Sequence, residues 1–131
     1  MVIDTSAILA ILFNEPDAPA FELAIELDSV RLMSAASFLE TAIVVEARLG
    51  DSAGRELDLL IYRAGITIVS VTAEQDEVGR DAFRRFGRGR HAAALNFGDC
   101  FAYALSQTSG EPLLFKGDDF RQTDVTPVRM A

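Results

Sequence analysis

Acidic residues occur at positions in this chain where several carboxylates could act together. Asp4 directly follows a short apolar run, and the pair Asp118-Asp119 follows another. Glu40 and Asp99 lie within segments whose apolar spacing predicts helices. Ligands of open parallel sheets bind at the carboxyl ends of the strands, so acids just beyond two strands can meet acids on neighbouring helices.

Such a group of carboxylates needs a positive counter-charge. Three or four acids in one place repel one another and raise their own pKa values. The predicted helix that holds Glu40 has no Lys or Arg before Arg48, two turns later. A divalent cation would supply the charge, and oxygen-only ligands select Mg²⁺ or Mn²⁺, which also bind phosphate. With one His and one Cys in the chain, a zinc site of nitrogen and sulfur ligands is excluded.

Each acid also has a purely structural interpretation. Asp4 can cap a helix, and Asp99 can stabilise a helix start through the helix dipole. Glu40 can face solvent or pair with Arg48. The Asp118-Asp119 pair can be ordinary turn residues after Gly117. No acid is diagnostic by itself, and only their combination favours a metal site.

The net charge of −8 argues against a protein that coats nucleic acid through bulk charge. The charge is uneven, however, because five of the 12 basic residues lie between Arg80 and His91. This stretch is either a solvated helix end with its loop or a surface that contacts phosphate, since the arginine fork matches phosphate oxygens. The candidates for phosphate contact are Arg84, Arg85, Arg88 and Arg90.

Short apolar strands that alternate with helices predict an α/β domain with a mostly parallel sheet and helices on both faces. The expected helices are 7–13, 17–27, 35–49, 54–64, 73–86 and 97–107, and the expected strands are 2–3, 30–33, 66–71, 113–116 and 125–129. We expect one domain over residues 1–131, because the length is typical and no linker or repeat interrupts the chain.

Three of these elements carry sharper expectations. Ten of the 15 residues in helix 35–49 are apolar, which predicts a central, buried helix. The β-branched run ITIVSV at 66–71 predicts a buried strand. Thr72 and Gln75 have the spacing of a capping box, and Ser34 and Asn96 are candidate N-caps.

Other classes of protein are disfavoured. No apolar run is long enough to span a membrane, and the apolar N-terminus lacks the basic start of a signal peptide. The single Cys100 excludes an internal disulfide and suits a reducing compartment, so we expect a cytoplasmic location.

Four segments together resemble the PIN-domain ribonucleases, and within them the VapC-type toxins of type II (VapBC) toxin–antitoxin systems. The segments are VIDTSAILA, SFLETAIV, GRGRHAAALNFGDCFAYALS and PLLFKGDDFRQTDV. The resemblance covers Met1 to about Val125 and keeps the order and spacing of the family motifs. It implies a PIN-like three-layer α/β/α fold with a mostly parallel central sheet.

The resemblance also implies site residues. The family's first acid falls on Asp4, assisted by Thr5 or Ser6, its second on Glu40 and its third on Asp99. These acids would hold Mg²⁺ or Mn²⁺, with Asp4 and Asp99 as direct ligands and Glu40 as a ligand or acting through a water.

The fourth acid is open to alternatives, because the motif GDDF offers two candidates. We place Asp118 first and Asp119 beside it, and either could orient the attacking water. Asp124 is a further candidate nearby.

The activity implied by the resemblance is that of a toxic Mg²⁺-dependent endoribonuclease. The implied partners are an RNA substrate and a VapB-type antitoxin, with a homodimer and a larger assembly formed with the antitoxin. One alternative is a catalytically silent PIN-like binding module in a regulatory complex. A phosphatase that uses an aspartyl nucleophile is a weaker alternative, since Asp4-Thr5-Ser6 lacks the second Asp of the Asp-x-Asp motif.

Overall fold

A four-stranded parallel sheet forms the centre of the computed structural model, which describes residues 1–130. The strands are β1 (Val2–Ile3), β2 (Leu32–Ser34), β3 (Thr67–Val69) and β4 (Leu113–Leu114), in the order β3-β2-β1-β4. In the register, Val2 lies beside Leu32 on one side and Leu113 on the other. The mostly parallel sheet predicted from the sequence is therefore confirmed.

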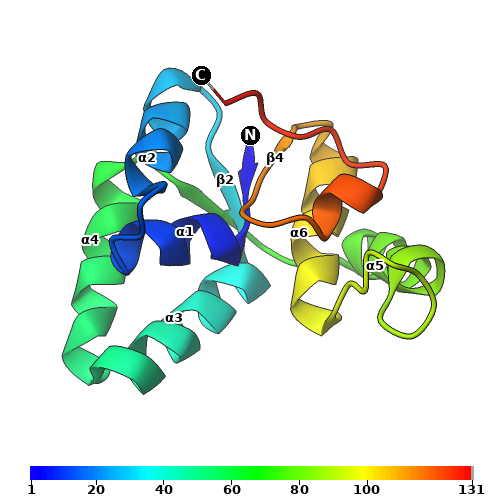
Figure 1. Cartoon of the computed structure of the whole chain (residues 1–131), viewed down its shortest axis with the longest axis horizontal. Coiled ribbons are helices and arrows are strands. Elements are labelled where there is room, and N and C mark those ends of the chain that lie inside the picture. Colours follow the sequence, from blue (N-terminus) through cyan, green and yellow to red (C-terminus); the bar gives the residue numbers. More distant parts are fainter. Residues whose placement is uncertain (131) are drawn as a thin grey trace.

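Helices cover both faces of this sheet (Figure 1). One group consists of α1 (Thr5–Leu12), α2 (Ala18–Leu27), α3 (Ala35–Leu49) and α4 (Gly54–Arg63). The other consists of α5 (Ala73–Phe86) and α6 (Phe97–Ser109). Two short 3-10 helices complete the fold, η1 (Asp51–Ala53) and η2 (Phe120–Gln122). This arrangement is the expected three-layer α/β/α fold.

The pleat of the strands explains why there are two cores. Successive side chains of a strand point to opposite faces, so Val2 packs with α5 and α6 while Ile3 packs with α1, α2 and α4. Leu113 and Leu114 of β4 divide between the two cores in the same way. Each two-residue strand therefore joins both layers of helices to the sheet.

Helix α3 has the predicted bounds, but the prediction that it is central and buried is wrong. Its buried residues are Ser37, Thr41 and Val45. The larger apolar side chains of Leu39 and Ile43 are 60% and 58% exposed. Two of these three buried residues are small and carry hydroxyl groups, on the side where α3 packs against α1. Composition alone did not reveal which side of the helix faces inward.

Two strand predictions also need correction. The strand at 66–71 is shorter and is not buried, because β3 is the edge strand of the sheet, where Thr67 and Ile68 are exposed. The segment 125–129 forms one isolated bridge between Leu113 and Pro127 instead of a strand. Its partner β4 is only two residues long, so the segment has little backbone to pair with.

The helix caps agree more closely with the sequence. Ser34 and Asn96 accept hydrogen bonds from backbone N–H groups of α3 and α6, as expected of N-caps. At α5, Thr72 accepts from the backbone of Gln75, but the Gln75 amide donates to the Ser70 carbonyl instead of closing the capping box. Among the described residues, no helix is long and apolar enough to cross a membrane.

Candidate active site

The carboxylates meet where the direction of the chain through the sheet reverses. From β1 the chain continues to β2 and β3, and it then crosses back to place β4 on the other side of β1. Such a switch point is where open α/β sheets bind ligands. Asp4 follows β1 at this point, and its backbone N–H donates to the carbonyl of Leu114 in β4.

Asp4 is both the N-cap of α1 and a buried acid. Its carboxylate accepts hydrogen bonds from the backbone N–H (3.0 Å) and the hydroxyl (2.6 Å) of Ser6, and the residue is 5% exposed. Burial raises the pKa of Asp4, the bonds from Ser6 oppose this rise, and the nearby charge of Glu40 adds to it. Asp4 therefore caps α1 and also lies within electrostatic range of Glu40.

A buried row of hydroxyl groups fixes α1 against α3 beneath this acid. Thr5 Oγ1 donates to the Ser37 carbonyl (3.1 Å), and Thr41 Oγ1 lies 3.1 Å from Thr5 Oγ1 and 2.7 Å from the same carbonyl. Asp4 precedes Thr5, and Glu40 precedes Thr41. The row thus sets the spacing of the two acids, and sequence reasoning missed Ser37 and Thr41.

Glu40 reaches from α3 to the first turn of α6. Its carboxylate lies so close to Gly98 that a Cβ on residue 98 would overlap both carboxylate oxygens. Gly98 therefore gives Glu40 room beside Asp99, the next residue along α6. The alternative that Glu40 pairs with Arg48 fails, because the Arg48 guanidinium stacks on Phe13, 4.2 Å from the ring centroid.

Asp99 lies in the first turn of α6, close to the other acids. It forms a complete capping box, in which Asn96 N donates to Asp99 Oδ2 and Asp99 N donates to Asn96 Oδ1, both at 2.9 Å. The pKa of Asp99 is raised to about 6, mainly by burial. The hydrogen bond from Asn96 lowers this pKa, whereas the negative charges of Asp4, Asp119 and Glu40 raise it further. Asp99 therefore caps α6 and also lies within electrostatic range of the other acids.

The loop after β4 separates the three candidates for the fourth acid. Asp119 is close enough to raise the pKa of Asp99, whereas Asp118 is 90% exposed, with Oδ1 3.8 Å from Arg121 Nε. Asp124 accepts hydrogen bonds from Tyr103 and Arg85. The structure thus brings Asp119, and not Asp118 or Asp124, into electrostatic range of Asp99.

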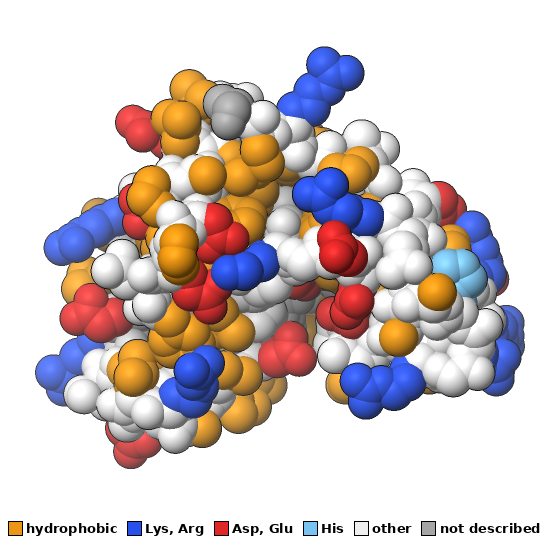
Figure 2. Space-filling view, in the orientation of Figure 1, with side chains coloured by type: hydrophobic (Ala, Val, Ile, Leu, Met, Phe, Trp, Pro, Cys, Tyr) orange, Lys and Arg blue, Asp and Glu red, His pale blue; other side chains and the backbone are white. Residues whose placement is uncertain are grey.

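An open notch lies between the two groups of helices, and acidic side chains are exposed on its walls (Figure 2). Within residues 1–130, no three His, Cys, Asp or Glu side chains are gathered closely enough to enclose a metal ion. The donor set nevertheless suits Mg²⁺ or Mn²⁺, since the pKa values of Asp4 and Asp99 are raised and a divalent cation would favour their ionised forms while leaving space for water ligands.

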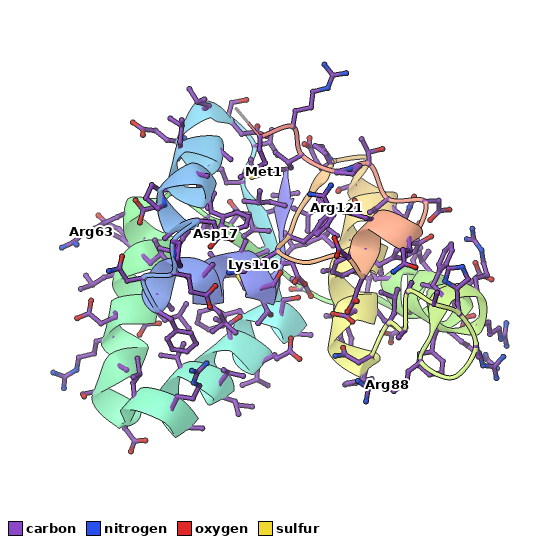
Figure 3. The ribbon with its side chains drawn as sticks, in the orientation of Figure 1. Met1, Asp17, Arg63, Arg88, Lys116 and Arg121 are labelled. Carbon is purple, nitrogen blue, oxygen red and sulfur yellow. The ribbon has the colours of Figure 1, made fainter. Side chains whose placement is uncertain are left out.

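A lysine that the sequence analysis did not single out borders the notch. Lys116, the only lysine of the chain, pairs with Glu15 and with Asp17 (3.1 Å), which connects the loop after β4 to the turn after α1 (Figure 3). Its backbone N–H donates to Ser6 Oγ at 2.9 Å. Nothing local in the sequence pairs residues about a hundred positions apart, so no sequence signal could have found this contact.

The arginines of the basic stretch are not equivalent. Arg85 donates to Asp124 and pairs with Asp81, so its guanidinium is engaged within the fold. For the side chains of Arg84, Arg88 and Arg90, no ion pair is found anywhere in residues 1–130. Arg88 lies near the N-terminal end of α6, where Asp99 also lies (Figure 3).

Comparison with known proteins places this geometry in a family. The family model described as PIN domain matches residues 1–125. The chain belongs to the PIN-domain family. The chain is 57% identical over 130 residues to the VapC ribonuclease Mb0640 of Mycobacterium bovis. It is 59% identical over 128 residues to a ribonuclease VapC of Mycolicibacterium smegmatis. Each alignment covers at least 98% of both chains. The PIN domain is thus of the VapC type.

A solved structure supports the same fold. Mycobacterium tuberculosis VapC20, described as a sarcin–ricin loop cleaving toxin, superimposes with a TM-score of 0.79 over 98% of both chains. The sequence identity is 18%, so this likeness concerns the fold alone.

The contact between Glu40 and Gly98 gives a direct test of the site. We expect Gly98→Ala to push the Glu40 carboxylate away and lower RNA cleavage by about 10- to 100-fold, since small displacements of a site group are costly. Stability should change little, because Ala is the better helix former.

Gly54→Ala is the matched control for this variant. Gly54 also lies in the first turn of a helix, and a Cβ there would meet the Glu46 carboxylate of α3, away from the acids. Cleavage rates measured for both variants decide the matter, and equal rates in the two would contradict the role of Glu40.

Proposed function

We propose that this PIN domain is a Mg²⁺- or Mn²⁺-dependent endoribonuclease and the toxin of a VapBC-type pair. The observation that carries the proposal is the grouping of Asp4, Glu40, Asp99 and Asp119 at the switch point, with the pKa of Asp99 raised to about 6. Mycobacterial relatives that share more than half of their residues with this chain are named VapC ribonucleases, which supports the same activity.

Each acid has a defined part in the proposed reaction. Asp4 and Asp99 would hold the cation, which when bound neutralises charge on the scissile phosphate and lowers the pKa of a water. Glu40 acts as a further ligand or through a water. Asp119, on the exposed side of the group, orients the attacking water in line with the phosphorus and the leaving oxygen. Asp118 lies one residue from this position and is the alternative for that part.

The test is cleavage of RNA by the purified protein. RNA incubated with Mg²⁺ or Mn²⁺ should acquire new 5′ ends at a small number of positions, identified by sequencing. Positions in single-stranded or loop RNA are expected, because bases are accessible there. RNA that is bound but never cut would favour the catalytically silent module instead.

The arginines free of internal ion pairs are proposed to hold the RNA backbone. We expect Arg88→Gln and Arg90→Gln each to raise KM several-fold while leaving kcat close to the parent value. Each should also lower the number of counterions released on RNA binding by about one, as expected for a lost phosphate contact. This number is obtained from the slope of log K against log salt concentration.

Arg63→Gln is the control for these two variants. Arg63 projects from α4 on the opposite side of the molecule (Figure 3). Binding isotherms at several salt concentrations compare the three variants with the parent. A salt dependence that is unchanged in both loop variants would remove them from the RNA-binding surface.

A toxin of this type needs an inhibitor, and we propose a VapB-type antitoxin. An arginine of the antitoxin could enter the acid group in place of the cation by charge alone.

We also propose a homodimer, supported by exposed apolar side chains on adjoining helices: Leu39 and Ile43 on α3 and Phe97, 77% exposed, on α6. The mass of the protein in solution, alone and with the antitoxin, tests both points.

A further inference from the structure

The loop that carries Asp119 is fastened on both sides of that residue. Before it, the Lys116 N–H donates to Ser6 Oγ at 2.9 Å. Directly after it, Phe120 is buried at 3% exposure in the core shared with α5 and α6. At the far end, Asp124 is bound by side chains of those two helices. These contacts leave the loop little freedom to move Asp119.

Asp124 has one donor for each carboxylate oxygen. The Tyr103 hydroxyl of α6 donates to Oδ1 at 2.6 Å, and Arg85 Nη2 of α5 donates to Oδ2 at 2.9 Å. Arg85 Nη1 also donates to the Tyr103 hydroxyl at 3.4 Å, which closes the group of three side chains. Burial alone would raise the pKa of Asp124, but the bonds from Tyr103 and Arg85 outweigh it and the pKa is lowered.

The position of Tyr103 on α6 links this contact to the proposed chemistry. Tyr103 follows Asp99 by four residues, so both side chains project from the same face of the helix, one turn apart. The helix that carries the third acid therefore also holds the loop that carries the fourth. A bond from Tyr103 to Asp124 fixes the loop relative to Asp99 itself.

We propose that Arg85, Tyr103 and Asp124 are positioning residues that hold Asp119 beside Asp99. This inference rests on the proposed nuclease function, because Asp119 needs a fixed place only if it takes part in a reaction. It also gives Arg85 a role inside the fold in place of RNA contact. We call these three residues the Asp124 clamp.

The clamp contributes more to local order than to global stability. Arg85 and Asp124 are 45% and 49% exposed, and exposed ion pairs add little to the free energy of unfolding. Local opening of a loop, in contrast, depends directly on the few contacts that hold it. Loss of one clamp hydrogen bond should therefore affect the loop and the reaction strongly while lowering the melting temperature by only about 5 °C.

Two variants weaken the clamp with little change of shape. Tyr103→Phe keeps the ring and removes the hydroxyl, and Asp124→Asn keeps an acceptor and removes the charge. The matched controls are Tyr62→Phe, on an 84% exposed tyrosine, and Asp58→Asn, on the exposed side of α4. All four proteins should show the circular dichroism of the parent. The two controls should also keep its melting temperature, and the two clamp variants should melt no more than about 5 °C lower.

Hydrogen–deuterium exchange measures the loop directly and needs neither metal nor RNA. Amide exchange in residues 117–124 should become about tenfold faster in both clamp variants, as expected for one lost hydrogen bond to a charged group, and stay unchanged in both controls. Unchanged exchange in both clamp variants would overturn the proposal.

Kinetics then test whether the clamp acts through Asp119. We expect kcat to fall about 10- to 100-fold in Tyr103→Phe, with KM for RNA within about twofold of the parent. In an Asp119→Asn background the same change should cost almost nothing more, because the group it positions is already gone. A full additional loss in the double variant would contradict positioning and indicate an independent role.

The two measurements separate the inference from the function beneath it. A parent protein that cuts no RNA would refute the proposed function, whereas the exchange data would still report on the clamp. A parent that cuts RNA, with clamp variants as active as the controls, would refute the clamp alone.

Discussion

Replacing Asp99 by Asn is expected to lower RNA cleavage by about a thousandfold or more, because it removes a ligand charge from the centre of the acid group. The helix should survive this change. An Asn side-chain oxygen can still accept the hydrogen bond that Asp99 Oδ2 accepts from Asn96 N, so the start of α6 keeps its cap. The loss can therefore be assigned to chemistry and not to unfolding.

The same variant should be more stable than the parent at neutral pH. Because the pKa of Asp99 is raised from 3.8 to about 6, the folded state binds a proton more tightly than the unfolded state. The contribution of Asp99 to the free energy of unfolding is greatest below about pH 4, where the group is protonated. This contribution is lost as the pH rises through about 6 and does not return at higher pH. With solvent screening of a partly exposed group, the gain in Asp99→Asn at pH 7 is about 1 to 2 kcal/mol.

Chemical unfolding at pH 4 and pH 7 checks this expectation, together with cleavage assays at pH 7. The advantage of Asp99→Asn should be present at pH 7 and absent at pH 4. Asp58→Asn, an exposed acid of α4, should show neither the loss of activity nor the gain in stability. An Asp99→Asn protein that cleaves RNA like the parent would refute the assignment of Asp99.

Removal of divalent ions is expected to abolish cleavage completely, and Mg²⁺ or Mn²⁺ should restore it. The ion should also stabilise the fold, since at about 100 times its Kd it adds about 2.7 kcal/mol, which raises Tm by about 10 °C. This stabilisation needs ionised acids. It should therefore appear as the pH rises through about 6, the pKa of Asp99, and level off above that.

Thermal melts with and without ion at pH 5 and pH 8 separate this effect from general salt effects. We expect a large ion-dependent shift in Tm for the parent at pH 8, a small one at pH 5, and none in Asp99→Asn at either pH. An equal shift in Asp99→Asn would place the ion elsewhere on the protein. Cleavage that persists in a chelator would refute metal dependence outright.

Much of the candidate site could be predicted because its acids follow simple rules. Asp4 stands directly after a strand, and Asp99 stands three residues after an N-cap, so local pattern placed both correctly. Asp118 and Asp119 are neighbours with identical chemistry, and only the path of the loop decides which of them approaches Asp99.

Other features could not be predicted because they depend on contacts between distant segments. The apolar content of α3 revealed a helix but not which face is buried, since that depends on the close approach of α1. The partners of Arg85 and Lys116 lie far away in the chain, at Asp124 and Glu15. No local pattern encodes such pairs, so the sequence suggested RNA contact for Arg85, which the fold uses internally.

The distribution of the four acids along the chain has a consequence for how the cell makes this protein. Asp4 is synthesised before the other three acids, and Asp119, which follows β4, is synthesised last of the four. The acids come together only after β4 has inserted beside β1, the last pairing of the sheet to form during synthesis. A chain that lacks the segment from β4 to Asp119 therefore has no complete set of acids, and the candidate site exists only once that segment has been synthesised and has folded.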